Sequence, residues 1–277
     1  MFRLPLSKLF LIAILTVGSG PAGAAPEAEL WARWIAFDPA STATVGHGAW
    51  TAFLDRYRVV GTDGIARVRY AAVDASDRAA LDSYLDLLGT TRVSALDRPE
   101  QRAFWINLYN ALTVRLVLDH MPVDSIRDID ISPGMFADGP WGAALLAVEG
   151  APLTLDDIEH RILRPIWHDP RLHYVLNCAS LGCPDLPPEA ATAANAERLL
   201  DAAARAYVNH PRGVSFDPDD GLVVSSLYDW YAADFGGSDA AVIAHLRRYA
   251  EPALAERLAA AGEIGEDAYD WRLNDAP

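Results

Sequence analysis

The stretch RPEQRAFWINLYNALTVRLVLDH, residues 98–120, carries the strongest secondary-structure signal in the chain. At 100° per residue, Phe104, Leu108 and Leu112 fall on one side of a helix, and Ile106 falls on the opposite side. A helix that is apolar nearly all round is buried on every side. The spacing therefore predicts a buried central helix, with the rest of the fold packed around it.

Two amide side chains, Asn107 and Asn110, lie within an apolar face of this predicted helix. Each buried amide must find hydrogen-bond partners, because an unsatisfied one costs about 1–3 kcal/mol. They are either tethers to neighbouring backbone or parts of a site. Most buried polar side chains bond to backbone, which favours the tether.

The remaining periodicity and turn signals predict elements on both sides of this helix. We expect helices at 27–36, 47–59, 74–88, 189–208, 228–235 and 240–261, a helix starting at Thr154 or Asp156, hairpins at 144–154 and 214–226, and strands at 67–73, 172–176 and near the end of the chain. Helices dominate and short strands are scattered. The sequence therefore predicts an α+β fold, a helix-rich single domain with short, mainly antiparallel strands around the buried central helix.

Residues 1–24 have the pattern of a cleaved secretory signal peptide. Arg3 and Lys8 precede an apolar run over residues 9–17, and small residues follow up to Ala24. The run is too short to cross about 30 Å of hydrocarbon. No cysteine lies near the cleavage point, so no lipid anchor is expected there. We therefore expect one globular domain over 25–277, periplasmic or secreted, with no membrane span after signal removal.

The charge and the lysine content exclude several classes of function. The formal net charge is −15, and such an acidic surface repels nucleic acid and anionic lipid. Lys8 is the only lysine in the sequence. A mature chain without lysine has neither a Schiff-base lysine nor a phosphate-loop lysine. We expect no cofactor and no nucleic-acid partner.

The stretch HYVLNCASLGCPDL, residues 173–186, contains both cysteines of the chain. In an oxidising compartment a close pair of cysteines usually forms a disulfide. A turn at 181–182 would bring the α-carbons of Cys178 and Cys183 within the required ~4.4–6.8 Å. The closed loop is small, so the stabilisation would be roughly 2 kcal/mol. This interpretation predicts a Cys178–Cys183 disulfide.

A catalytic interpretation of the same stretch makes Cys178 a nucleophile, because a thiolate is a strong attacking group. His173 lies five residues earlier, which points it to the opposite face of a continuing strand. His160, with Glu159 to orient it, is the other candidate base. A zinc site built from the two cysteines and these histidines is disfavoured by the C-x4-C spacing, and no metal is expected.

Other chemically suggestive residues have simpler structural interpretations. Trp230, Tyr231 and Trp271 have core-like spacings, so we expect packing rather than ligand binding. Asp156 and Asp157 precede a helix, where acidic side chains favour the helix dipole.

Several blocks of the sequence resemble the domain-of-unknown-function family 547. They are AFWINLYNALTV at 103–114, LDDIEHRILR at 155–164, HYVLNCASLGCPDL at 173–186, LYDWYAADFG at 227–236 and YDWRLN at 269–274. The resemblance covers about 70–274 and implies an exported bacterial domain without an agreed activity. The family's pattern implies Trp105, Asn107, Tyr109, Asn110 and Ser180 as candidate binding residues, beside Glu159, His160, His173 and Cys178. Asp185 departs from the pattern, since another proline is common there.

Two classes of function remain open. The leading interpretation is a non-catalytic envelope binding or maintenance protein, held by the Cys178–Cys183 disulfide and taking a peptide-like envelope ligand. The alternative is a thiol-dependent hydrolase or acyl transferase, with Cys178 as nucleophile and a histidine as base. A sulfur–sulfur bond would favour the first class, and a histidine beside the Cys178 sulfur in an open cleft would favour the second. The sequence indicates no oligomeric state.

Overall fold

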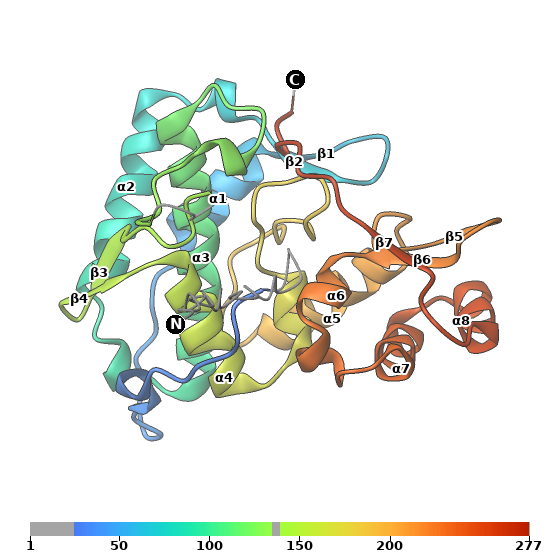
Figure 1. The fold of residues 1–277 in the computed structure, drawn as a ribbon. Coiled ribbons are helices and arrows are strands. Elements are labelled where there is room, and N and C mark those ends of the chain that lie inside the picture. Colours follow the sequence, from blue (N-terminus) through green and yellow to red (C-terminus); the bar gives the residue numbers. More distant parts are fainter. Residues whose placement is uncertain (1–24, 135–138, 277) are drawn as a thin grey trace, which may run out of the picture.

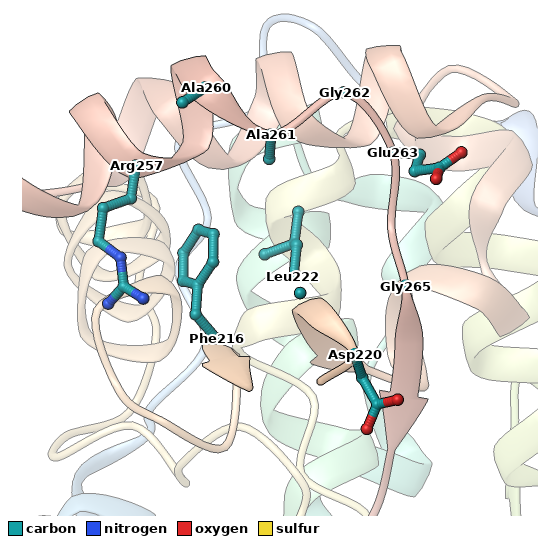
Figure 2. A pocket seen from close by; sticks show the side chains of 10 residues that line it. Phe216, Asp220, Leu222, Arg257, Ala260, Ala261, Gly262, Glu263 and Gly265 are labelled. Atoms are coloured by element: carbon teal, nitrogen blue, oxygen red, sulfur yellow. The ribbon is translucent and has the colours of Figure 1, made fainter. Parts of the chain in front are cut away.

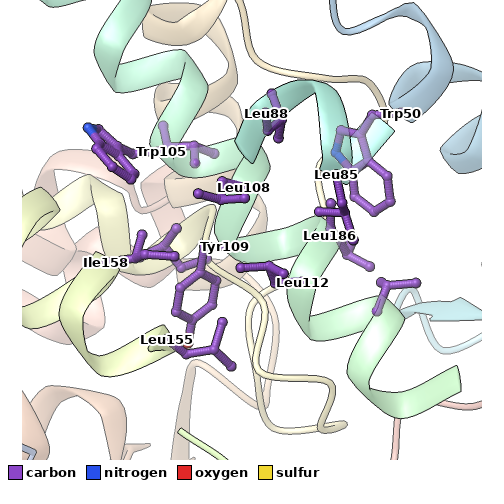
Figure 3. Packing of buried hydrophobic residues seen from close by; sticks show 14 of the residues in the cluster. Trp50, Leu85, Leu88, Trp105, Leu108, Tyr109, Leu112, Leu155, Ile158 and Leu186 are labelled. Atoms are coloured by element: carbon purple, nitrogen blue, oxygen red, sulfur yellow. The ribbon is translucent and has the colours of Figure 1, made fainter. Parts of the chain in front are cut away.

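The predicted central helix is α3 (Arg98–His120). The computed structural model describes residues 25–134 and 139–276, so the predicted signal peptide lies outside the described residues. Asp97 caps α3 by accepting a hydrogen bond from the amide of Glu100 at 2.8 Å. Figure 3 shows side chains of α3 packed between those of neighbouring helices and loops. Burial on all sides confirms the prediction made from its apolar pattern.

Helices dominate the described chain, and Figure 1 shows α1, α2 and α3 gathered on one side of the molecule and α5 to α8 on the other. The helices are α1 (Gly48–Tyr57), α2 (Ala75–Thr90), α3, α4 (Arg164–Trp167), α5 (Ala196–Val208), α6 (Leu227–Trp230), α7 (Asp239–Tyr249) and α8 (Pro252–Ala260). The 3-10 helices are η1 (Ala32–Ile35), η2 (Tyr70–Ala72), η3 (Val93–Ala95), η4 (Ile126–Asp128), η6 (Pro170–Tyr174) and η7 (Ala232–Phe235), and η5 (Asp157–Leu163) is a π-helix.

The strands are short and form three small sheets, as the α+β prediction requires. They are β1 (Arg58–Val60), β2 (Ala66–Val68), β3 (Leu146–Val148), β4 (Ala151–Leu153), β5 (Val214–Asp217), β6 (Gly221–Ser225) and β7 (Glu266–Ala268). The pairs β1–β2, β3–β4 and β5–β6 are antiparallel, and β7 adds to β6 in parallel. The hairpin between β3 and β4 turns at Glu149 and Gly150, both with positive φ, as the sequence predicts. The fold is therefore α+β with mainly antiparallel strands.

The apolar core consists of two clusters of buried side chains that meet along α5. The larger cluster surrounds α3 and includes Leu199 and Leu200 of α5. The smaller one lies between α5, α6, α7, α8 and the β5–β6 hairpin, and includes Ala204 and Tyr207 of α5. Because α5 contributes to both clusters, it holds the two parts of the fold together.

One predicted strand is wrong. Residues 172–176 were expected to be a buried strand, but residues 170–174 form the 3-10 helix η6. The side chain of Asp169 caps η6 through the amide of Arg171 at 3.0 Å, and Pro170 supplies the fixed φ of a first helical position. The apolar run in this segment indicated burial, which is correct, but burial alone does not distinguish a strand from a helical turn.

Other boundaries differ by several residues. The predicted strand at 67–73 is limited to β2, since η2 follows at Tyr70. The predicted helix at 189–208 begins only at Ala196, because residues 190–195 form turns held by the side chain of Asn195. The helix predicted at 240–261 is divided at Pro252 into α7 and α8.

Candidate functional site

The loop that carries Cys178 is fixed by the side chain of Asn177. The Asn177 amide donates to the carbonyl of Pro184 at 2.7 Å, and its oxygen accepts from the amide of Ala179 at 3.0 Å. The side chain of Asn274 donates to the same oxygen at 3.2 Å. A buried side chain therefore replaces the regular backbone ladder that the loop lacks.

The residue after Cys178 has an uncommon backbone conformation. Ala179 has a φ of 60°, in the left-handed region that residues with a Cβ rarely adopt. Cys178, which precedes it, is half-buried, and Ser180, which follows it, is buried. Non-glycine residues in such conformations occur where the surrounding structure holds them, often at functional sites. The turn leaves the Cys178 side chain the accessible one of this short stretch.

Two hydroxyl groups contact the Cys178 sulfur. Its Sγ lies 3.1 Å from the hydroxyl of Tyr269 and 3.3 Å from that of Ser180. The Ser180 hydroxyl also donates to the Tyr269 hydroxyl at 3.0 Å. Burial raises the pKa of the Cys178 thiol, but hydrogen bonds from Cys183, from the Ser180 hydroxyl and amide, and from Tyr269 outweigh it, so the pKa is lowered. The local donors therefore favour the thiolate.

The predicted Cys178–Cys183 disulfide is not present, since both cysteines carry free thiols. The Cys183 sulfur instead accepts the backbone amide of Cys178 at 2.8 Å and lies 3.6 Å from the carbonyl of Leu176. The loop thus turns so that the Cys183 sulfur faces backbone groups. Burial and the neighbouring Cys178 raise the pKa of the Cys183 thiol. The two thiols are chemically unlike, one half-buried and acidic, the other buried and weakly acidic.

A segment from the end of the chain closes over this loop. The amides of Leu181 and Gly182 donate to the carbonyls of Arg272 and Asp270, each at 2.8 Å. A Cβ on Gly182 would lie 2.7 Å from the Asp270 amide and 3.0 Å from the Tyr269 ring. Only glycine permits so close an approach. Tyr269 is therefore held against Cys178 by backbone contacts on both sides.

Glu159 and His160 lie on the π-helix η5. Thr154 and Asp157 start this helix by capping each other, with Asp157 N–H donating to the Thr154 hydroxyl at 2.9 Å and Thr154 N–H to the Asp157 carboxylate at 3.1 Å. The amide of Arg164 then reaches back five residues to the carbonyl of Glu159. Such wide turns are rare and frequently lie at functional sites. Here the two consecutive polar side chains are both buried.

These side chains join residues from distant segments in what we call the acid–histidine cluster: Glu159, His160, Arg164, His173 and Asp234. The Asp234 carboxylate accepts from Nε2 of His173 at 2.7 Å and from Nε of Arg164 at 2.6 Å. Nδ1 of His173 lies 3.6 Å from Glu159 Oε1. Arg164 also contacts Nδ1 of His160 at 2.9 Å. Each charge in the cluster therefore has an opposite charge or a hydrogen-bond partner beside it.

The pKa shifts follow from this pairing. Burial alone would raise the pKa of Glu159, but His160, His173 and Tyr231 outweigh it and lower the pKa to about 2. Burial would lower the pKa of His173, but Asp234 and Glu159 raise it. The pKa of Asp234 is lowered well below its usual range by His173 and Arg164, against its burial. Glu159 and Asp234 are thus held as carboxylates within the protein, on either side of His173.

No histidine contacts the Cys178 sulfur in the described residues, which corrects the prediction of a histidine base beside it. The side chain that lies near both groups is Tyr231. Its pKa is raised first by burial, then by the charge of Glu159 and its hydrogen bond, and further by Cys178. Its ring centre lies 3.9 Å from that of His173. Tyr231 therefore packs against the acid–histidine cluster, and its pKa responds to both Glu159 and Cys178.

The candidate binding residues on α3 are buried, and the side chains of the two asparagines are hydrogen-bonded to backbone groups. The Asn107 amide exchanges hydrogen bonds with the backbone of Ala191 at 2.7 and 2.9 Å. Asn110 donates to the carbonyl of Val175 at 2.8 Å and accepts from the amide of Asn177 at 2.8 Å. Both amides are tethers, as the sequence favours. Trp105 and Tyr109 are also buried within the core, whereas Ser180 contacts the thiol.

The acid–histidine cluster is covered by the first described residues of the chain. The amides of Glu29 and Trp31 donate to the carbonyls of His160 and Arg161, each at 3.0 Å. The carbonyl of Pro26 accepts from Arg164 at 2.6 Å. This segment covers the cluster on that side, whereas Asp234 and Cys178 are each half-buried.

A surface cavity of about 420 Å³ lies away from both groups, between the β5–β6 hairpin, α8 and the segment before β7 (Figure 2). Its charged lining residues are Asp220, Arg257 and Glu263, and the Arg257 guanidinium stacks on the Phe216 ring at 3.9 Å. The cavity contains no cysteine or histidine. In the described part of the chain, no group of three or more His, Cys, Asp or Glu side chains is arranged to hold a metal ion.

The fold and site together define an α+β protein with a half-buried cysteine, whose thiol pKa is lowered, near a buried acid–histidine cluster. Residues 93–208 match the model of the family described as "Protein of unknown function, DUF547". The resemblance predicted from the sequence blocks is confirmed over this segment, which carries α3, η5, η6 and the Cys178 loop. The blocks at 227–236 and 269–274, with Asp234 and Tyr269, lie outside the match. The chain has no significant match among curated proteins or among solved structures.

One further finding bears on the predicted location. None of the helices in residues 25–134 and 139–276 is long and apolar enough to cross a membrane. The family description assigns no activity, so function must be argued from the site itself.

Proposed function

We propose that the protein is a thiol-dependent acyl-transfer enzyme, a hydrolase or an acyl transferase, with Cys178 as its nucleophile. The observation that carries this proposal is the set of donors around the Cys178 sulfur. The hydroxyls of Tyr269 and Ser180 lie within 3.3 Å of the sulfur of Cys178, a half-buried residue, and the pKa of its thiol is lowered. A reactive cysteine needs a stabilised thiolate and access to solvent, and a purely structural cysteine needs neither.

The non-catalytic binding function predicted from the sequence loses its main support. That interpretation depended on a disulfide that would consume the only candidate nucleophile. With Cys178 and Cys183 both free, the nucleophile is available. The free thiols therefore favour the catalytic alternative.

The proposed reaction does not need a histidine beside the sulfur, because hydrogen bonds already favour the thiolate. The Cys178 thiolate attacks the carbonyl carbon of the substrate and forms a C–S bond. The bond to the leaving group then breaks, and the leaving group takes a proton from water. Water or another acceptor attacks the thioester, loses its proton to solvent, and releases the thiolate. Tyr269 remains a protonated donor throughout, with the Ser180 hydroxyl donating to its oxygen, and can follow the negative charge from sulfur to the developing oxyanion.

In this proposal Glu159, His160 and His173 are positioning residues. They bind one another, Arg164 and Asp234 rather than the sulfur. The cluster joins η5, η6 and η7, and η6 leads directly into the Cys178 loop. It therefore fixes the segment that leads into the loop.

The test is acylation by p-nitrophenyl acetate, a small activated ester. The wild-type protein should release nitrophenolate and carry a transient acetyl group on Cys178, detected by mass spectrometry of peptides. The Cys178→Ala variant should lose both signals. Cys183→Ser is the matched control, because it removes the other thiol and keeps a small polar group beside the Cys178 amide, and it should retain both signals. Ester hydrolysis that is the same in wild type and Cys178→Ala would overturn the proposal.

The predicted substrate, a peptide-like envelope molecule, belongs to this proposal. It depends on export by residues 1–24, which lie outside the described residues. Fractionation of the native host followed by detection of the mature chain would test it. A chain found with its first 24 residues intact in the cytoplasm would contradict it.

A further inference from the structure

Four half-buried aromatic rings lie together beside the thiol, and we call them the aromatic platform: Trp141, Trp230, Tyr269 and Trp271. The Trp230 and Trp271 rings are stacked at 5.4 Å, and each lies 4.7 Å from the Tyr269 ring. Trp141 meets Trp271 edge to face at 5.9 Å. The sequence predicted packing for Trp230 and Trp271, and they do pack, but against one another and near the surface.

The platform is continuous with the candidate nucleophile. Tyr269 belongs to both, since its ring is part of the platform and its hydroxyl lies 3.1 Å from the Cys178 sulfur. The backbone of this segment is fixed by the hydrogen bonds from Leu181 and Gly182. The thiol is therefore one hydrogen bond away from the platform.

The platform is unlike the aromatic residues of the core. Trp50 and Trp105 are fully buried, whereas all four platform rings keep part of their surface in water. Clustered, partly exposed aromatic rings are typical of binding sites, where they supply large rigid contact areas. The indole N–H groups of Trp230 and Trp271 have no hydrogen-bond partner within residues 25–134 and 139–276, so they remain donors for a ligand carbonyl.

The chemistry of the platform indicates the kind of ligand. Rings prefer offset or edge-to-face contact with other rings, worth about 0.5–1.5 kcal/mol beyond the area buried. The Arg127 guanidinium lies 5.3 Å from the centre of the Trp271 ring, which disfavours a cationic ligand, and the net charge of −15 disfavours an anionic one. An uncharged aromatic ring next to a carbonyl matches these groups. The ligand ring would pack against the platform rings, and its carbonyl would lie near the indole donors and the thiol.

We propose that the aromatic platform binds an uncharged aromatic ring of an acyl substrate, placed next to the carbonyl that Cys178 attacks. This proposal rests on the proposed acyl-transfer function and names its substrate class. Peptide-like acyl compounds with a phenylalanine, tyrosine or tryptophan side chain belong to this class. The sequence did not predict it, because the platform rings come from three separate segments of the chain.

The test compares the rates at which matched chloroacetamides alkylate Cys178. The reagents are N-benzyl chloroacetamide, its saturated N-cyclohexylmethyl analogue and the anionic N-(4-carboxybenzyl) compound. Each rate is divided by the rate for iodoacetamide, which corrects for the reactivity of the thiol itself. The benzyl reagent should react about twofold to tenfold faster than the saturated one, because ring contact adds to equal apolar size. The anionic reagent should be the slowest.

Two variants link the selectivity to the platform. Trp230→Leu and Trp271→Leu should each bring the ratio of benzyl to cyclohexylmethyl rates close to one. Trp167→Leu is the control, since Trp167 is a half-buried tryptophan outside the platform, and it should keep the wild-type ratio. Circular dichroism of each variant establishes that it is folded.

The two proposals fail in different ways. Measurements at about pH 9.5, above the ordinary thiol pKa of about 8.5, allow any accessible thiol to react, so the ratio is obtained whether or not Cys178 is activated. Equal normalised rates for the two uncharged reagents would overturn the platform proposal alone. A slow reaction with iodoacetamide at neutral pH would count against the thiol function instead.

Discussion

Asn110 of α3 holds the backbone of Asn177, one residue before Cys178, through a hydrogen bond of 2.8 Å from the Asn177 amide to Asn110 Oδ1. The same side chain donates to the carbonyl of Val175 at 2.8 Å. The most buried helix of the protein therefore fixes the start of the Cys178 loop directly. The position of the thiol depends on the central helix as well as on the loop itself.

We predict that Asn110→Ala destabilises the protein by about 2–3 kcal/mol, because it leaves a buried carbonyl and a buried amide without partners. Urea unfolding measures the change. Ser83→Ala on the exposed face of α2 is the control, and it should shift stability by no more than about 0.5 kcal/mol. An Asn110→Ala variant as stable as the control would mean that the tether contributes nothing.

The acid–histidine cluster predicts a pH dependence of stability with two limbs. The pKa of Glu159 is lowered to about 2, so its ionised form stabilises the fold above the unfolded pKa of about 4.3, and this stabilisation is lost as the pH falls towards 2. The pKa of His173 is raised, so its contribution is complete below about pH 6.5 and is lost as the pH rises through the folded value. Stability from this cluster should therefore be greatest between about pH 4.3 and 6.5.

Urea unfolding across a pH series tests both limbs. Glu159→Gln should flatten the acid limb, with a change on the order of 3 kcal/mol, and His173→Gln should flatten the alkaline limb. Glu256→Gln, which alters an exposed carboxylate on α8, should leave both limbs as in the wild type. Identical acid limbs for wild type and Glu159→Gln would show that Glu159 is not ionised in the folded protein.

Tyr269→Phe should make Cys178 a weaker acid. The substitution removes one donor to the thiolate and keeps the ring, so the apparent pKa should rise by about one unit, and alkylation at neutral pH should slow about tenfold. Tyr249→Phe, at the end of α7, removes a hydroxyl outside the site and should leave the rate unchanged. An unchanged rate in Tyr269→Phe would remove Tyr269 from the proposed mechanism.

The two thiols should also differ in access. Ellman's reagent should titrate one thiol in the native protein and two after denaturation without reductant, since Cys183 is buried and its pKa is raised. No thiol in either sample would mean that the cysteines are joined, as the sequence first indicated, and that the nucleophile is consumed.

The sequence predicts an element of the fold well when the contacts that determine this element are local. The apolar spacing around Leu108 gives α3, Asp74 caps α2 through the amides of Ser76 and Asp77, and Glu149-Gly150 gives the β3–β4 turn. Each of these signals acts over a few residues. Local physics therefore suffices to predict the element and its boundaries.

The candidate site is predicted less completely, because its contacts join distant segments. Glu159, His160, His173 and Cys178 were all identified, but the partners that define their chemistry were not. Asp234 lies 61 residues from His173, and Tyr269 lies 91 residues from Cys178. Their family-like blocks at 227–236 and 269–274 were the available signal. Neither spacing nor periodicity indicates which side chain of such a block meets which partner.

The disulfide prediction failed for a related reason. Compartment and spacing favour a bond between Cys178 and Cys183, but the orientation of each sulfur depends on the turn at Ala179. That turn is imposed by Asn177, Asn274 and the segment that ends the chain. These contacts leave the Cys183 sulfur facing the Cys178 amide.

The most direct test of the account is the pH dependence of iodoacetamide alkylation of Cys178 in the native wild-type protein, followed by peptide mass spectrometry, with Cys183 as the internal comparison. The account predicts that Cys178 reacts with a midpoint below the ordinary thiol pKa of about 8.5 and that Cys183 stays unlabelled until the protein is denatured. A Cys178 midpoint at or above that value would contradict an activated thiolate, and with it the proposed acyl-transfer function.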